Sequence, residues 1–248
     1  MRSSLVVLAV ALASATPAAA QDSRVFANIN FGYQVQDQDL RQTAEFPLYD
    51  ETATWEATHA LEGGPIFDLG AGFRVLPKLS IGASYTLRTK QSRDVTVNAS
   101  IPSPAFTDTF RQATASATGL EYTEQAFHVQ AFWHIPVTVE FEVMLFGGPT
   151  FFQLENDLIS GIDIVEAGGD FSSVSLQNVS TTRASESTVG FNVGIDGTYM
   201  FMRNAGVGAM LRYSRGSADL AAPAGTGSDS FDVDAGGFEI AAGLRFRF

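Results

Sequence analysis

Cysteine is absent from the sequence, and charged residues are scarce. With no cysteine among 248 residues, the chain can form no disulfide bond, no thiolate nucleophile and no cysteine-bound metal centre. Charged residues make up 17% of the chain, against roughly 25% in soluble domains. Lysine occurs only as Lys78 and Lys90, and the net charge is −12. A chain this acidic, with no basic stripe to neutralise phosphates, is not expected to bind nucleic acid.

Long hydrophobic runs are absent as well. Beyond the first residues the chain has no uninterrupted apolar stretch of the roughly eighteen residues that a transmembrane helix requires. The chain is therefore expected to be either a soluble β protein or a closed membrane β-barrel. The barrel is the only other arrangement that satisfies every backbone hydrogen bond in lipid.

The N-terminus has the composition of an export signal. Arg2 precedes an apolar run over residues 5–13, and an A-x-A pattern of small residues ends at Ala20. We predict a secretory signal peptide over 1–20, cleaved before Gln21. The alternative is a membrane anchor, which would need a longer apolar run.

Alternation of apolar and polar residues dominates the rest of the chain, 21–248, which we predict to be one domain. In the final FEIAAGLRFRF every second residue is apolar, and the residues between include Glu239, Arg245 and Arg247. Such alternation is typical of β-strands with two unlike faces. Eight stretches share it: Val25–Val35, Phe67–Val75, Leu79–Leu87, Phe127–Ile135, Val139–Leu145, Val189–Phe201, Val207–Tyr213 and Phe238–Phe248.

The connections between these stretches alternate sharply in length. Those around Pro77, Pro136 and Asn204 are a few residues long. The others span about 36–63, 91–120, 154–186 and 215–233. Alternation continues in DVTVNASI and LEYTEQAF, and also in FSSVSLQNVSTT, so the second and third long connections are expected to extend above the membrane as hairpins. Short turns at one end and long loops at the other are typical of outer-membrane barrels, in which the short turns are periplasmic. We therefore predict an all-β fold: an eight-stranded antiparallel up-and-down transmembrane β-barrel with short periplasmic turns and long extracellular loops.

The direction of the charged face separates two kinds of barrel. A soluble lipocalin-like barrel would turn this face to water and hold the apolar side chains inside. The interior of an eight-stranded barrel is just wide enough for its own side chains, so it could not hold this many aromatic residues. We therefore predict that the apolar face meets lipid and that the charged face lines the lumen. The predicted lumen residues are Asp68, Arg74, Arg88, Glu124, His128, His134, Glu140, Glu142, Asp196, Arg212, Glu239, Arg245 and Arg247.

A lumen lined by these charges is predicted to be plugged. Charges in a narrow, poorly hydrated space are costly unless they are paired, so we predict a structural network of ion pairs. The alternative is a gated ion path or a proton relay through His128 and His134. Catalysis is not expected, because the chain has three histidines and lacks the G-x-S-x-G, H-E-x-x-H and phosphate-loop motifs. No cofactor or metal site is predicted; the acidic long loops leave divalent-cation binding open, although no EF-hand spacing supports it.

The export signal, the eight amphipathic stretches and the terminal GLRFRF together resemble the small eight-stranded outer-membrane proteins of the OmpA, OmpX and OmpW kind. The resemblance covers the mature chain as a pattern and transfers no functional residue by motif. It implies the cell outer membrane as the location, outer-membrane lipid as the surroundings, and a monomer. It also implies that Phe246 and Phe248 form a C-terminal signal for the barrel-assembly machinery, with periplasmic chaperones as partners during biogenesis.

Three functions follow from this resemblance and from the charges. We predict a structural or surface-interaction role without catalysis. The alternatives are an OmpW-like passage of small hydrophobic molecules and, less favoured, a lipid-modifying enzyme. Passage of apolar molecules would need an apolar upper lumen, whereas Asp68, Glu124, Asp196 and Glu239 are predicted to lie there.

Overall fold

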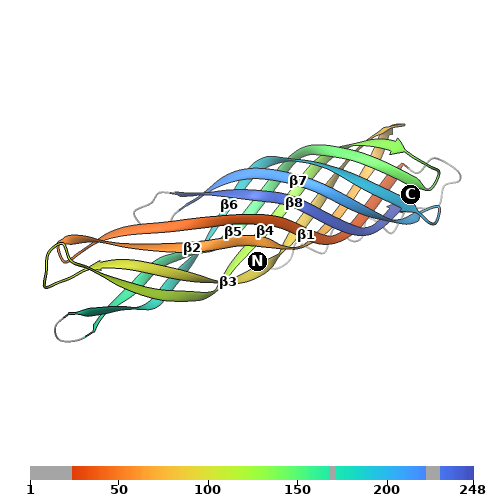
Figure 1. Ribbon diagram of the computed structural model, residues 1–248. Coiled ribbons are helices and arrows are strands. Elements are labelled where there is room, and N and C mark those ends of the chain that lie inside the picture. Colours follow the sequence, from red (N-terminus) through yellow and green to blue (C-terminus); the bar gives the residue numbers. More distant parts are fainter. Residues whose placement is uncertain (1–23, 168–170, 222–229) are drawn as a thin grey trace, which may run out of the picture.

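The protein is a single closed β-barrel with an extended outer end. A computed structural model describes residues 24–167, 171–221 and 230–248, and the predicted signal peptide lies outside them. Eight antiparallel strands follow one another around the barrel in chain order (Figure 1). They are β1 (Val25–Leu48), β2 (Glu51–Leu76), β3 (Leu79–Pro102), β4 (Phe110–Pro136), β5 (Phe141–Ala167), β6 (Ser173–Met200), β7 (Ala205–Ala221) and β8 (Ser230–Arg247). The predicted all-β, eight-stranded antiparallel barrel is confirmed.

The barrel closes where β1 pairs with β8. The ladder runs from Phe26 opposite Arg247 to Val35 opposite Phe238. Two glycines make the close approach of these strands possible. A Cβ atom on Gly243 would lie 1.8 Å from the carbonyl oxygen of Ile29, a distance that no side chain tolerates. A Cβ on Gly32 would lie 2.2 Å from the carbonyl oxygen of Ile240, so the seam depends on glycine from both strands.

A belt of exposed apolar side chains surrounds the barrel. Every strand contributes at least one large apolar residue to it: Phe31, Leu69, Ile81, Val129, Leu145, Val193, Leu211 and Ile240. Phe31, for example, has an exposed fraction of 66%. In water, a complete ring of such exposed apolar side chains would be costly in free energy. The belt therefore faces lipid, and the lipocalin-like arrangement is excluded. No helix in the described part of the chain is long and apolar enough to cross a membrane.

Strands β1–β6 continue far beyond the belt. They are 24–28 residues long, whereas β7 and β8 have 17 and 18. A tilted strand needs only about 9–11 residues to cross the hydrocarbon. Most of the three long connections 36–63, 91–120 and 154–186 is therefore extended strand, as expected for the second and third; the first was predicted as a loop. The β1–β2 connection is only Tyr49 and Asp50, both with positive φ angles of 53° and 62°.

We call the extension of β1–β6 beyond the belt, residues 36–62, 91–121, 156–167 and 171–186, the tower. Its strands invert the polarity of the barrel. In the barrel part of β1, Gln34 is buried and Tyr33 is exposed; in the tower, Leu40 is buried and Arg41 is exposed. The same inward face thus changes from polar to apolar where the strand leaves the membrane.

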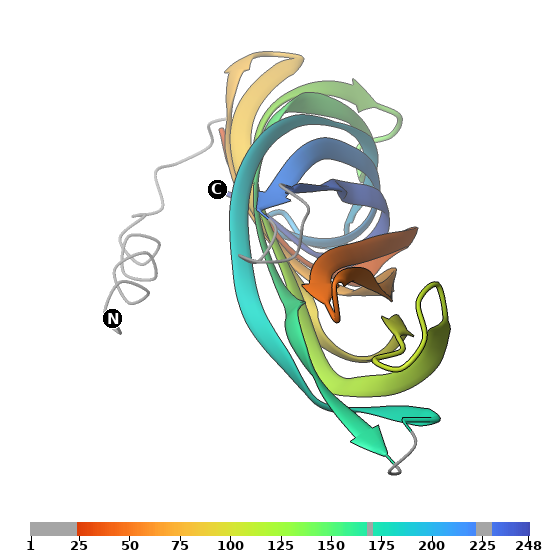
Figure 2. The ribbon, with the colours of Figure 1, turned by 90° about the vertical axis from the view of Figure 1, so that its left-hand side faces the viewer.

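The tower has an apolar core of its own. Its buried members come from β1 to β5: Ala44, Ala53, Trp55, Ala57, Val95, Val97, Ala99, Ile101, Ala117, Leu120 and Ile159. Ladder pairing between β4 and β5 ends with Tyr122 opposite Asn156. Beyond that point the β5–β6 hairpin packs against the sheet of β1–β4 rather than continuing it (Figure 2).

A polar clasp joins the tips of the tower. Glu166 of β5 accepts hydrogen bonds from both terminal nitrogens of Arg111 on β4, and the Tyr49 hydroxyl donates to it at 3.1 Å. The hydrogen bond from Arg111 lowers the pKa of Glu166 from its usual 4.5, so the carboxylate stays charged to a more acidic pH than an isolated glutamate. Arg111 also donates to the Pro102 carbonyl of its own hairpin at 2.7 Å. Glu166 on the β5–β6 hairpin is thus joined to the β3–β4 hairpin through Arg111 and to the β1–β2 turn through Tyr49.

Candidate functional site: the charged lumen

The middle of the lumen is built around one fully buried guanidinium. Arg212 of β7 donates from Nη1 to Asp68 of β2 at 3.0 Å and from Nη2 to Glu239 of β8 at 2.5 Å. Both carboxylates have further donors: Asn30 to Asp68 at 2.8 Å and Ser214 to Glu239 at 3.1 Å. These side chains reach across the lumen from four strands, and every one is at most 1% exposed.

A second ion pair lies above the first. Arg88 of β3 approaches Glu124 of β4 at 3.5 Å, with both side chains almost completely buried. Glu124 also accepts hydrogen bonds from the Tyr122 hydroxyl at 2.9 Å and from the Gly236 backbone at 3.0 Å. The guanidinium of Arg88 lies over the Tyr122 ring, 5.1 Å from its centroid. A buried carboxylate is thus matched by a cation and by neutral donors, as burial of a charge requires.

An aromatic layer closes the lumen below these ion pairs. The ring of Phe132 lies 5.2 Å from that of Phe26 and 5.6 Å from that of Phe146. Met144 and Met210 belong to the same buried cluster. Phe132 interrupts the alternation of β4, since it occupies an inward position among polar residues; the structure explains it as part of this layer.

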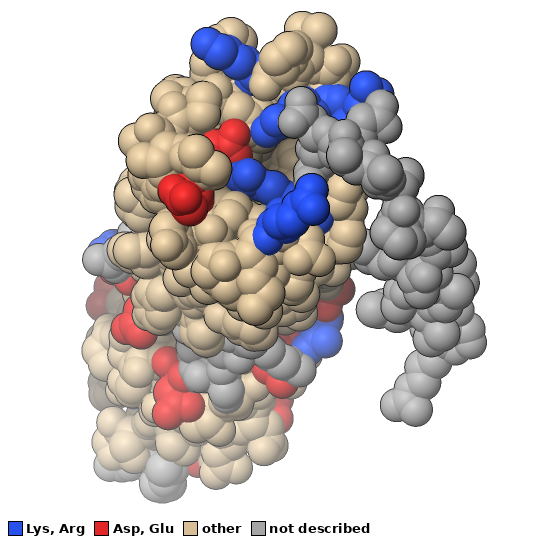
Figure 3. Space-filling view, turned by 90° about the vertical axis from the view of Figure 1, so that its right-hand side faces the viewer, with Lys and Arg blue, Asp and Glu red and all other residues tan. Residues whose placement is uncertain are grey.

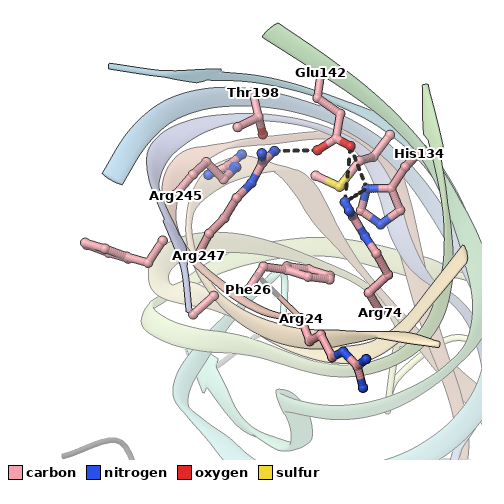
Figure 4. Close-up of a pocket in the computed structure, with 11 residues that line it drawn as sticks. Arg24, Phe26, Arg74, His134, Glu142, Thr198, Arg245 and Arg247 are labelled. Atoms are coloured by element: carbon pink, nitrogen blue, oxygen red, sulfur yellow. Dashed lines mark hydrogen bonds and ion pairs between the residues drawn. The ribbon is translucent and has the colours of Figure 1, made fainter. Parts of the chain in front are cut away.

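The periplasmic mouth holds the last group of charges (Figure 4). Glu142 of β5 accepts hydrogen bonds from Arg74 of β2 at 3.4 Å and from Arg247 of β8. His134 of β4 contacts the same carboxylate, with Nδ1 and Oε1 2.9 Å apart. A little deeper in the lumen, Arg245 of β8 forms a buried ion pair with Asp196 of β6, so the charge of this arginine is neutralised.

Twelve of the thirteen predicted lumen residues lie inside or at the mouth of the barrel, and one prediction is wrong. Glu140 is exposed in the turn between β4 and β5, where it contacts Thr138 at 3.3 Å. Pro136 ends β4 and β5 begins only at Phe141, so the alternation through Glu140 belongs to a turn. Asp196 was expected at mid-height or above, but its pairing with Arg245 places it low in the lumen.

The two inward histidines belong to separate groups. His128 contacts Thr86 at 3.2 Å and Thr150 at 2.8 Å, both through hydroxyl oxygens. His134 contacts Ser80, Arg74 and Glu142. Within the described residues no direct hydrogen bond links one group to the other.

Ser80, His134 and Glu142 have the order of a hydrolytic triad, and sequence reasoning missed this arrangement. Ser80 Oγ lies 2.6 Å from His134 Nε2, and His134 Nδ1 lies 2.9 Å from Glu142. The Ser80 side chain is nevertheless fully buried, with an exposed fraction of 0%. A substrate carbonyl has no access to its oxygen, which nucleophilic attack requires. The three groups join β3, β4 and β5 at the mouth.

Other polar partners were missed as well. Asn30, Gln34 and Thr86 complete the coordination of the buried carboxylates. Their positions on the inward-facing side of the alternating strands could have identified them as lumen residues. The sequence does not indicate, however, which carboxylate each of these uncharged side chains contacts. In the described part of the chain no group of three histidine, aspartate or glutamate side chains is arranged to hold a metal ion.

No family model matches the chain, and no curated protein matches its sequence. Among solved structures, the outer-membrane protease OmpT of Escherichia coli matches with a TM-score of 0.50 at 11% identity, over 91% of this chain and 97% of that chain. The outer-membrane protein OprG of Pseudomonas aeruginosa matches with a TM-score of 0.49 at 10% identity, over 92% of this chain and 96% of that chain. The N-terminal barrel domain of OprF from the same organism gives a TM-score of 0.42 at 10% identity, over 92% and 100%.

The fold is that of outer-membrane β-barrels. At such low identity the likeness concerns the fold alone, and the proteolytic activity is that of OmpT. The apolar belt adds independent evidence for a lipid environment. Together they show a membrane-spanning β-barrel with the fold of outer-membrane proteins, and the predicted resemblance to small barrels of this kind is confirmed at the level of the fold.

Proposed function

We propose that the protein is a closed, non-catalytic outer-membrane barrel whose functional part is the tower, which interacts with partners outside the cell. One observation carries this proposal: six strands continue well past the belt and enclose an apolar core of their own. A barrel needs no such structure to span the membrane. A rigid, hydrogen-bonded extension presents a defined surface, whereas long flexible loops would not.

The lumen supports a closed barrel rather than a pore. Two buried ion-pair groups and the aromatic layer follow one another along the axis. Each of these layers would have to open for ions to pass, and breaking a buried ion pair leaves an uncompensated charge. The buried network is thus proposed to order and plug the barrel.

The outer surface of the tower indicates the charge of its partner. Among the side chains that the structure describes, exposed carboxylates outnumber the exposed cations Arg41 and Arg183; they include Asp39, Glu45, Asp50, Glu56, Glu62, Asp94, Asp108 and Asp163. A surface of one sign steers partners of the opposite sign. We therefore expect the tower to bind a basic surface.

Neutralising the tower should weaken such binding. In the variant Asp39→Asn, Glu45→Gln, Asp94→Asn, three exposed carboxylates without an ion-pair partner among the described residues lose their charge. Binding of an arginine-rich peptide to the refolded barrel should weaken several-fold and become less dependent on salt. The single variant Glu140→Gln, at the opposite end, is the control. Equal affinity in the triple variant and the wild type would reject the tower as the binding surface.

Planar-bilayer recording tests the closed lumen. The wild type, refolded and shown to be a barrel by heat-modifiable gel migration, should give no stable conductance steps. Replacing Phe132 and Phe146 by alanine should leave the ion pairs in place and still give no open pore. Reproducible, ion-selective currents in the wild type that disappear in Arg88→Gln or Glu239→Gln would overturn the closed-barrel proposal.

Passage of small apolar molecules is the second candidate, and one observation favours it. Above the ion pairs the lumen is apolar, with Leu40, Phe152 and Val233 in one buried cluster. The β7–β8 hairpin covers this cluster, and its ladders to β6 and β1 end at Phe191 and Val35 while the hairpin itself continues. Faster uptake of a hydrophobic dye by vesicles that contain the refolded protein than by empty vesicles would support passage; equal rates would exclude it.

A further inference from the structure

The periplasmic end of this acidic protein is basic. Arg24 precedes β1, Arg74 and Arg247 lie at the ends of β2 and β8, and Lys78 and Arg203 occupy the β2–β3 and β6–β7 turns. Figure 3 looks onto this end, where blue side chains surround a hollow and only a few red ones accompany them. The charge of this end is therefore opposite to that of the tower.

A small pocket opens at the centre of this end. Its lining includes Arg24, Phe26, Arg74, Glu142 and Arg247. The enclosed part of the pocket is small, with room for about one water molecule. Figure 4 shows Arg74 and Arg247 reaching Glu142 from opposite sides, while Arg24 stands at the edge with its guanidinium directed away from Glu142. The aromatic layer behind Phe26 closes the pocket toward the lumen.

Most hydrogen-bond donors of the two inner arginines are unused. A guanidinium carries five N–H donors. Toward the described residues, Arg74 uses only Nη2, which faces Glu142 and His134, and Arg247 uses only Nη2, which faces Glu142. Their side chains remain 28% and 25% exposed, so the other donors are open to the mouth. Two cations share one carboxylate here, and Arg24 has no ion-pair partner among the described residues, so positive charge is in excess.

We propose that this pocket binds a phosphate group between Arg74 and Arg247. Planar guanidinium groups recognise phosphate oxygens with pairs of parallel hydrogen bonds, which a compact ammonium does not offer. Because the enclosed space holds only about one water molecule, the phosphate lies in the open mouth against the exposed donors of both arginines, and it enters from the periplasmic side. Glu142 competes for the same two arginines and therefore sets the affinity. The phosphate comes either from a soluble phosphate compound or from a phospholipid headgroup of the inner leaflet.

Titration calorimetry with inorganic phosphate tests the pocket directly. The full-length barrel is refolded in an alkyl maltoside, a detergent without phosphate, and titrated at constant ionic strength. Arg74→Gln and Arg247→Gln should each weaken binding by about tenfold or more, because each removes a charge-assisted donor pair. Glu142→Gln should strengthen binding several-fold, since it releases both guanidinium groups. Lys78→Gln and Arg203→Gln remove the same charge outside the pocket and should change the affinity less than about threefold.

Lipid retention separates the two sources. Micelles doped with phosphatidylglycerol are analysed by native mass spectrometry for lipid that stays bound to the wild type and to Arg247→Gln. Loss of retained lipid in the variant, without binding of free phosphate, supports the pocket with a headgroup as ligand; binding of free phosphate supports a soluble ligand. If neither probe depends on Arg74 or Arg247, or if the two control variants lose as much, the proposal is wrong. These outcomes are independent of the tower and its partner.

Discussion

Replacing Arg212 by methionine is expected to prevent stable folding of the barrel. The substitution leaves Asp68 and Glu239 facing each other in a lumen where both are at most 1% exposed. Removing one partner of a buried ion pair costs about 3–5 kcal/mol, a large part of the roughly 5–15 kcal/mol that separates folded from unfolded proteins. Urea unfolding in lipid vesicles should show a much lower midpoint, and heat-modifiable migration should be reduced or lost.

Two further variants show whether the charge or the packing is responsible. The triple variant Arg212→Met, Asp68→Asn, Glu239→Gln removes the unmatched carboxylates and should recover most of the stability, because apolar or neutral replacement of a whole buried network is often tolerated. Arg215→Met breaks an ion pair with Asp234 whose side chains are 57% and 43% exposed, and should cost at most about 1 kcal/mol. If the triple variant is as unstable as Arg212→Met, the lost charge is not the cause.

A methyl group at Gly243 should disturb the closure of the barrel. The Cβ atom of Gly243→Ala would lie 1.8 Å from the carbonyl oxygen of Ile29 and 2.8 Å from the Cα atom of Asn30. Backbone atoms cannot rotate away as a side chain can, so β1 and β8 must separate locally. We expect a loss of at least about 1–3 kcal/mol, the usual cost of overpacking, with faster hydrogen exchange in the β1–β8 ladder.

Gly161→Ala is the matched control for this prediction. A Cβ atom on Gly161 would meet no atom within 4 Å, and Gly161 lies in the tower on β5 rather than at the seam. Its stability should stay within about 0.5 kcal/mol of the wild type. The steric argument would be refuted if both alanine variants unfolded at the same urea concentration.

Much of the barrel could be predicted from alternation alone. The stretch Phe238–Phe248 was predicted as the last strand, with its apolar face to lipid, and the structure exposes Phe238, Ile240 and Leu244 while it buries Glu239 and Arg245. With a side-chain period of two, the only open question is which face of each strand meets lipid. The lumen of an eight-stranded barrel cannot hold this many aromatic residues, so the apolar face was predicted to face outward. That Phe246 and Phe248 guide assembly stays a prediction.

The tower was predicted only in part: alternation in 91–120 and 154–186 indicated hairpins above the membrane, whereas 36–63 was predicted as an acidic loop. Leu40, Ala44, Trp55 and Ala57 continue the alternation beyond the membrane but point inward, as in a water-soluble sheet. The many carboxylates on the outer face suggested loops. A reversal of the apolar face along one strand is the signal that marks the membrane boundary, since the solvent outside changes there from lipid to water.

By itself, the sequence determined the strand number, the two unlike faces and the acidic outer surface, because these depend only on periodicity and composition. The partners inside the barrel were decided by the tertiary structure. Arg212 meets Asp68 across 144 residues of chain, and Glu142 gathers Arg74, His134 and Arg247 from three other strands. Strand tilt and the offset between neighbouring strands fix which inward side chains share a height in the lumen. The alternation within one strand determines neither the tilt nor the offset. The pairing of charges and the basic periplasmic pocket can therefore be seen only in the closed barrel.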